Sequence, residues 1–212
     1  MRNITNGQYF NEYAKRHYSQ RFKGEFIPFN EALMDGSVVW PLFSQAFIQQ
    51  RCLDLAVDNH FYLQNLQAFL KSLPSIDTVN LFFGKDTFFF FFLLGVLAVL
   101  EQFHYPCANL YLIDDITCEI LKEKIEIDIN GYMEIAQTLF TQQKIILSDL
   151  PYLNEAMERY CCFKQGNDEV TAFIRAHRSM SNELLLQKAL VLGQKDGLSD
   201  QIILKMIERL RR

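Results

Sequence analysis

The sequence contains little of what marks collagen-like, disordered or coiled-coil chains. Its 212 residues include only five prolines and nine glycines, with no internal repeat and no Pro, Gly or Ser-rich stretch, whereas 50% of the residues are hydrophobic. This composition is typical of a globular protein that is long enough to bury a core without disulfides or metal. The signatures GxGxxG, Walker A, GxSxG and HExxH are absent as well.

An excess of positive charge is also missing. The chain carries 21 Lys and Arg against 25 Asp and Glu, a net charge of −4. Proteins that gain affinity by neutralising phosphates present a basic face. We therefore do not expect nucleic acid to be the main partner.

The five cysteines are an odd number and contain no CxxC pair, a pattern typical of reduced thiols in a cytosolic protein. The four histidines are scattered singly, so the sequence predicts no zinc site. The N-terminal residues contain no apolar segment of the kind found in a signal peptide. We therefore expect a cytoplasmic location.

Only one long apolar run occurs. Residues 88–100 are thirteen consecutive apolar residues, with Asp86 shortly before them and Glu101 directly after them. A membrane span needs about 18–20 such residues, and a shorter run is more typical of a core helix. We expect a buried helix and no membrane association.

Aromatic residues are abundant, with 19 Phe and nine Tyr, which predicts a core stabilised by large rings. The first 129 residues alternate short β-like runs with helical stretches, the pattern of βαβ units and a largely parallel sheet. Strands are expected around Ile4 and at 25–29, 78–83, 109–113 and 124–129, the last at an edge. Helices are expected at 8–18, 41–57, 61–73 and 87–103.

We therefore predict an α/β domain over 1–129, a mostly parallel sheet with flanking helices in Rossmann-like layers. Parallel strands covered on both faces read as apolar runs. The strand residues expected to be buried are Ile4, Phe26, Leu81, Phe83, Leu110 and Leu112.

After residue 129 the strand-like patterns disappear, and we predict an all-helical C-terminal region over 130–212. Pro151 suits a first helical position and Gly166 a C-terminal cap, after which Asn167 is the expected cap of the next helix. Gly193 and Gly197 bracket a turn before the last helix. The apolar stripe of that helix consists of Ile202, Ile203, Met206, Ile207 and Leu210.

Polar residues follow the predicted strands. In an open parallel sheet, ligands bind outside the carboxyl ends of the strands, so these residues define a candidate ligand-binding cleft. We assign to it Asn6, Gly7, Asn30, Glu31, Asp35, Arg51, Gly84 and Asp86, and the same loops also contain Gly36, Lys85, Asp114 and Asp115. Carboxylates gathered there would hold a divalent cation such as Mg²⁺ against a phosphate, or act as general acid and base.

Both the cluster and Arg51 have a simpler explanation. Asn, Asp and Gly are also common in turns and helix caps, so the cluster can be explained without a ligand. Arg51 stands among apolar residues of a predicted helix. It either pairs with a rim carboxylate or an anion, or extends its charged head into solvent along an apolar stem.

One segment resembles a known family. Residues 79–88, with the sequence VNLFFGKDTF, and the residues 93–102 that follow resemble the central motif of the bacterial domain of unknown function 1835. The Asn6-Gly7 turn, residues 29–36, Arg51 and residues 197–202 are similar to other landmarks of this family. The resemblance covers most of the chain and implies a domain over roughly 1–125 with a helical extension. It implies no activity.

The chain departs from that family between Asp86 and the paired leucines. Family members tend to have Cys-Gln, one variable residue and Asn, where this chain has Phe89 to Phe92. Phenyl rings offer no donor or acceptor to a polar ligand, and a run of five phenylalanines requires burial all around the helix. Either the chain has lost the family's ligand, or the run is an error in the sequence. We expect weaker binding than in a relative with Gln and Asn.

Three functions remain open, and the sequence does not decide whether the protein is an enzyme. The first is binding, or acting on, a small polar or phosphorylated ligand in an acidic cleft at the strand ends. The second is a DNA-associated transcriptional regulator, a label attached to some family members, with the last two helices as a helix-turn-helix. The second helix of such a motif contacts bases through its N-terminal residues. Asp200 would lie there, and its carboxylate would repel phosphate. The third is an interaction or scaffolding protein without catalysis.

Overall fold

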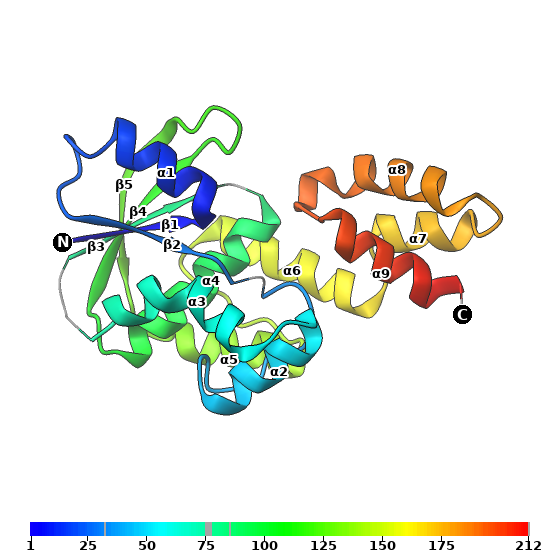
Figure 1. The fold of residues 1–212 in the computed structure, drawn as a ribbon, viewed down its shortest axis with the longest axis horizontal. Helices are drawn as coiled ribbons and strands as arrows, with labels where there is room; N and C mark the ends of the chain where they lie inside the picture. Colours follow the sequence, from blue (N-terminus) through cyan, green and yellow to red (C-terminus); the bar gives the residue numbers. More distant parts are fainter. Residues whose placement is uncertain (32, 75–77, 85, 212) are drawn as a thin grey trace.

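The computed structural model of the chain describes residues 1–31, 33–74, 78–84 and 86–211. Its five-stranded sheet has the strand order β2-β1-β3-β4-β5 (Figure 1). The strands are β1 (Arg2–Asn6), β2 (Glu25–Phe29), β3 (Val79–Phe83), β4 (Cys107–Ile113) and β5 (Ile120–Asp128). Between them lie α1 (Gly7–His17), α2 (Gln45–Leu55), α3 (Asn59–Ser72) and α4 (Thr87–Gln102).

The sheet is mostly parallel, as predicted. β1 pairs in parallel with β2 and β3, and β3 pairs in parallel with β4, whereas β5 is antiparallel to β4 at one edge. The six strand residues predicted to be buried are at most 4% exposed. The prediction of a mixed α/β fold with flanking helices is therefore confirmed.

The last strand begins earlier than the predicted 124–129, because β4 and β5 form a hairpin. Ile113 pairs with Ile120 across it. The turn between them is held by Asp114, whose Oδ1 accepts the backbone N–H groups of Ile116 at 2.9 Å and Thr117 at 2.8 Å. The strand therefore begins at Ile120, directly after this turn and four residues before the predicted start.

Helices cover both faces of the sheet, as Figure 1 shows. Successive strand residues point to opposite faces, so Phe82 packs with Phe10 of α1 on one side, whereas Leu81 and Phe83 belong to the core cluster under α3 and α4. The chain passes from β1 to β2 on one side and from β3 to β4 on the other. The strand order therefore reverses between β1 and β3.

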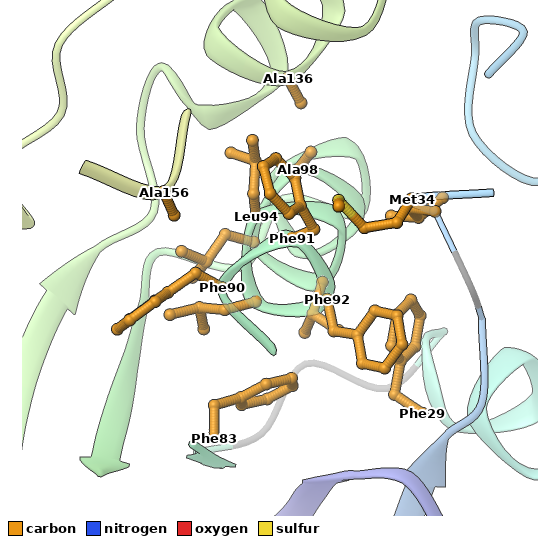
Figure 2. Close-up of a cluster of buried hydrophobic side chains, with 14 of the residues drawn as sticks. Phe29, Met34, Phe83, Phe90, Phe91, Phe92, Leu94, Ala98, Ala136 and Ala156 are labelled. Atoms are coloured by element: carbon orange, nitrogen blue, oxygen red, sulfur yellow. The ribbon is translucent and has the colours of Figure 1, made fainter. Parts of the chain in front are cut away.

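α4 is the centre of the larger core cluster. Figure 2 shows Phe90, Phe91 and Phe92 pointing in different directions from it, and all three side chains are buried. The ring of Phe91 lies 4.7 Å from that of Tyr160, and that of Phe92 lies 5.9 Å from that of Phe29. The predicted buried helix is confirmed for residues 90–100, while the side chains of residues 88 and 89 fall outside the described part.

The helices of the described residues are too short or too polar to cross a membrane. This finding agrees with the expectation, based on the length of the apolar run, that residues 88–100 form a core helix.

After β5 follow α5 (Tyr132–Gln142), α6 (Pro151–Gln165), α7 (Glu169–Ala176), α8 (Asn182–Gly193), the short 3-10 helix η1 (Gln194–Asp196) and α9 (Asp200–Arg211). Their apolar residues share one continuous cluster with the sheet, from Leu81 through Met157 to Ile203. In Figure 1, α6 runs from the α/β part toward α7, α8 and α9.

Several helix ends follow the predicted caps and others do not. Pro151 opens α6 and Gly166 ends it with a φ of 69°, as expected. The cap of α7 is Asp168, not the predicted Asn167, because the Asp168 carboxylate accepts from the backbone N–H of Thr171 at 2.8 Å and from its hydroxyl at 2.5 Å. The side-chain cap of α2, Ser44, likewise starts that helix later than the predicted residue 41.

Candidate functional site

The first polar group lies where the strand order reverses. The Asn6 amide at the end of β1 donates to the Asp115 carboxylate at 3.2 Å. That carboxylate covers Gly84 at the end of β3 so closely that a Cβ on Gly84 would overlap it. The Oδ1 atom of Asn6 is buried and has no hydrogen-bond partner among the described residues. A donor group that reached the end of β1 would satisfy this acceptor.

The second group is a buried ion pair behind β2. Arg51 on α2 is 0% exposed, and its Nε and Nη2 both donate to Oε1 of Glu31 at 2.8 Å. The hydroxyl of Tyr62 on α3 donates to the other carboxylate oxygen. Burial, together with the Glu31 carboxylate, raises the pKa of Tyr62 far above its ordinary value. Of the two predicted roles of Arg51, pairing with a rim carboxylate is the one observed.

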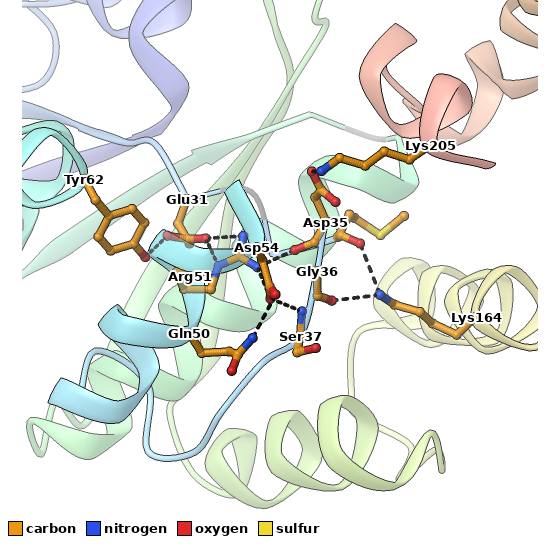
Figure 3. Close-up of polar contacts among 11 residues, drawn as sticks. Glu31, Asp35, Gly36, Ser37, Gln50, Arg51, Asp54, Tyr62, Lys164 and Lys205 are labelled. Carbon is orange, nitrogen blue, oxygen red and sulfur yellow. Dashed lines mark hydrogen bonds and ion pairs between the residues drawn. The ribbon is translucent and has the colours of Figure 1, made fainter. Parts of the chain in front are cut away.

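This ion pair anchors the segment that follows β2, residues 33–37. Arg51 Nη1 donates to the backbone carbonyl of Asp35, and the Asp54 carboxylate accepts the backbone N–H of Ser37 at 2.6 Å. Figure 3 shows these contacts on one side of the segment and two lysines of the C-terminal helices on the other. The segment is therefore fixed between the α/β part and the helices after β5.

A cleft of about 370 Å³ opens between the carboxyl edge of the sheet and the C-terminal helices. Met34, after β2, and Thr87, after the β3 loop, form its wall on the α/β side. We call it the acidic cleft, because its charged lining among the described residues consists of Glu155, Glu158, Asp168, Glu169, Asp196 and one cation, Arg159. Arg159 donates to Glu155 at 2.6 Å and to Asp196 at 2.9 Å. The hydrogen bonds to Asp196 and Glu155 raise the pKa of Arg159.

A second cavity of about 240 Å³ shares Met34 and Phe163 with the acidic cleft. We call it the basic cavity, because its charged residues in the described part are Lys164, Lys205, Arg209 and Asp35. Lys205 donates to Asp35 Oδ2 at 2.7 Å. Two small cavities of opposite charge therefore adjoin at Met34 and Phe163.

The structure places the predicted site residues in separate groups. Glu31, Asp35 and Arg51 come together in one, and Asn6 and Gly84 meet at Asp115 in another. The remaining predicted residues stand at element ends: Gly7 begins α1, Asn30 donates to the carbonyl of Asn65 at 3.4 Å, and Asp86 precedes α4, its carbonyl accepting from Phe90. Lys85 lies outside the described residues.

Sequence reasoning missed the residues of both cavities that come from α6, α7, η1 and α9. Of the residues named for the strand-end loops, Asp35 and Gly36 line the basic cavity, and none lines the acidic cleft within the described part of the chain. Tyr62 was missed as well, although a polar tip on an otherwise apolar helix face is a signal for it. No spacing in the sequence relates Lys164 or Arg209 to the strand ends.

The described residues contain no group of three His, Cys, Asp or Glu placed to hold a metal ion. All five cysteines are free thiols. Burial raises the pKa of the Cys118 and Cys161 thiols, whereas Cys107 and Cys162 are exposed.

Of the basic residues described on α9, Lys205 and Arg211 are engaged within the chain, whereas Arg209 makes no hydrogen bond or ion pair within the described part. Lys205 bonds to Asp35, and Arg211 donates to the Asn182 side chain and the Met180 carbonyl. The Lys195 side chain and Arg212 lie outside the described part. These contacts occupy two of the basic side chains that a helix-turn-helix ending in α9 would use on a phosphate backbone.

Comparison with known proteins found no matching family model, no similar curated protein and no similar solved structure.

Proposed function

We propose that the protein binds a small polar ligand in the acidic cleft, and that the ligand places a cationic or other donor group there. The observation that carries this proposal is the position of the cleft. Thr87, directly after the loop that ends β3, and Met34, after β2, form its wall, and carboxyl ends of parallel strands are where α/β proteins bind ligands.

The charge of the cleft supports a cationic group. Within the described part of the chain, five carboxylates and one guanidinium line the cleft, and carboxylates held together cost free energy unless a cation, a proton or a ligand compensates them. Arg159 compensates Glu155 and Asp196 through its two short contacts. A phosphate would be repelled here, so the phosphorylated ligand expected from the sequence does not suit this cleft alone.

Three finer statements belong to the same proposal. The reversal of strand order between β1 and β3 supports a Rossmann-like α/β domain over 1–129 with a helical extension over 130–212. The free thiols are compatible with a cytoplasmic location. The resemblance to domain 1835 would make the protein a bacterial member of that family.

Thiol labelling tests the proposal, because the chain supplies its own control. Cys162 lines the acidic cleft, whereas Cys107 is exposed at the start of β4, at the opposite end of the sheet. We expect spermidine, at constant ionic strength, to slow the reaction of Cys162 with a disulfide reagent several-fold. Labelling of Cys107, followed in the same sample by peptide mass spectrometry, should not change.

Charge-removing variants separate binding in the cleft from general screening. Glu158→Gln with Asp196→Asn should abolish the protection of Cys162 by spermidine, whereas Glu119→Gln, an exposed substitution in the β4–β5 turn, should preserve it. Equal protection of both cysteines, or protection that survives the double substitution, would exclude the acidic cleft as the binding site.

A further inference from the structure

We propose that the basic cavity is a subsite for the phosphoryl group of a phosphorylated small molecule. This inference deepens the proposed function, since it assigns the anionic part of the ligand to a cavity that adjoins the acidic cleft.

Lys164 is the central group of the cavity. Its ammonium donates to the backbone carbonyls of Gly36 at 3.1 Å and Met34 at 3.3 Å and lies 5.3 Å from the centre of the Tyr160 ring. An ammonium has three donors, so two carbonyls leave one for a further acceptor. Among the described residues no carboxylate forms an ion pair with it. In Figure 3 the Lys164 side chain extends from α6 to the segment around Gly36.

α9 supplies the other two cations of the cavity. Lys205 and Arg209 are four residues apart and therefore lie on the same side of the helix, and both line the cavity. Lys205 is bonded to Asp35. The guanidinium of Arg209 makes no hydrogen bond or ion pair within the described part of the chain, and it presents a planar set of donors suited to an oxyanion.

The charge balance of the cavity favours a phosphoryl group over a carboxylate. Among the described lining residues, three cations and the Asp35 carboxylate give the cavity a net charge of +2, in a chain whose net charge is −4. A phosphate monoester carries close to two negative charges at neutral pH and would balance this excess, whereas one carboxylate would balance half of it.

The pKa of Lys164 is lowered despite two nearby carboxylates. Burial has the largest effect, and the positive charges of Arg51 and Arg209 also lower the pKa, against the opposing effects of the Asp35 and Asp54 carboxylates. An anion bound between Lys164 and Arg209 would reverse this shift, because an opposite charge favours the charged form.

The two cavities together define the ligand class. Because Met34 and Phe163 line both, one molecule with an amine at one end and a phosphoryl group at the other could occupy them at once. Met34 and Phe163 would contact the carbon skeleton between the two charged ends.

Inorganic phosphate alone tests the subsite. At constant ionic strength, phosphate should raise the melting temperature of the full chain in a saturable manner, since a ligand that binds only the native state stabilises it. Acetate at the same ionic strength should have a clearly smaller effect. Arg209→Gln should weaken the apparent phosphate affinity about tenfold, the effect of losing one hydrogen bond to a charged group.

Arg178→Gln is the matched control, because Arg178 is also exposed in the C-terminal helical region but does not line the cavity. Lys164→Gln, with its fold checked by circular dichroism, is the second variant and should also weaken phosphate binding. A phosphate effect that is the same in Arg209→Gln and Arg178→Gln, or no phosphate effect in the unmodified chain, would overturn the inference. Protection of Cys162 by spermidine is measured separately, so either proposal can fail while the other stands.

Discussion

Replacing Arg51 with Met should lower the free energy of unfolding by about 3–5 kcal/mol, the usual cost of removing one partner of a buried ion pair. Arg51 and Glu31 are both fully buried and joined by two contacts of 2.8 Å. The substitution keeps the length of the stem but removes the guanidinium that makes both contacts with Glu31. Urea denaturation followed by circular dichroism measures the loss.

The double variant Arg51→Met, Glu31→Gln should recover a large part of this stability, because the cost arises from a buried charge without its counter-ion. Lys15→Met is the control, since Lys15 and Glu12 form an exposed pair at 3.1 Å, and such pairs contribute about 0–1 kcal/mol. Equal losses in Arg51→Met and Lys15→Met would show that the buried pair contributes no more than a surface pair.

Besides lowering stability, Arg51→Met should loosen residues 33–37, the segment after β2. Arg51 holds the Asp35 carbonyl, and Lys205 and Lys164 reach the same segment from α9 and α6. Through its contact with the Asp35 carbonyl, Arg51 therefore helps to fix one wall of the basic cavity. Phosphate binding should weaken in Arg51→Met even under conditions in which the variant stays folded.

Local patterns predicted most of the fold. β2 spans the predicted residues 25–29, and β1, β3 and β4 lie at the expected places, because parallel strands buried on both faces appear as short apolar runs between turn residues. The buried helix after β3 was also predictable, because a helix that is apolar all around must be buried. Cap positions such as Asp168 were off by one residue, because neighbouring Asn and Asp compete for the same N–H groups.

The candidate site was predictable only in part. Asp35 was predictable because it follows a predicted strand. The two possible roles of Arg51 were predictable because it lies among apolar residues of a predicted helix. Lys164 lies more than a hundred residues after Gly36, whose carbonyl it contacts, and the acidic cleft depends on how α6, α7 and η1 pack against the sheet edge. Contacts of this kind arise from tertiary packing and leave no period or spacing in the sequence.

The phenylalanine run was expected to weaken ligand binding relative to domain 1835 proteins, and the structure places the rings of Phe90, Phe91 and Phe92 in the core. Phe90 stacks on Tyr152 at 6.1 Å, and Phe92 packs against Phe29. Their rings therefore contribute to the core around α4. The expectation of weaker binding than in a relative with Gln and Asn stays a prediction, to be measured by titrating both proteins side by side.

Phe91→Ala should lower the free energy of unfolding by about 3–5 kcal/mol, the range observed for removing a buried aromatic ring. The side chain is 0% exposed, and its ring lies 4.7 Å from Tyr160 and 6.3 Å from Phe140. It therefore joins α4 to both α5 and α6, and the cavity left by alanine cannot close without moving these helices. Chemical denaturation of the full chain measures the effect.

Tyr9→Ala is the control for Phe91→Ala, because it also removes an aromatic ring from a helix but at a position that is 75% exposed. A surface substitution of this kind should change stability by no more than about 0.5 kcal/mol. Because α6 carries Cys162, loosening its contact with α4 in Phe91→Ala should also speed the labelling of the buried neighbour Cys161. A stability change in Phe91→Ala as small as that in Tyr9→Ala would show that the ring does not join the sheet layer to the C-terminal helices.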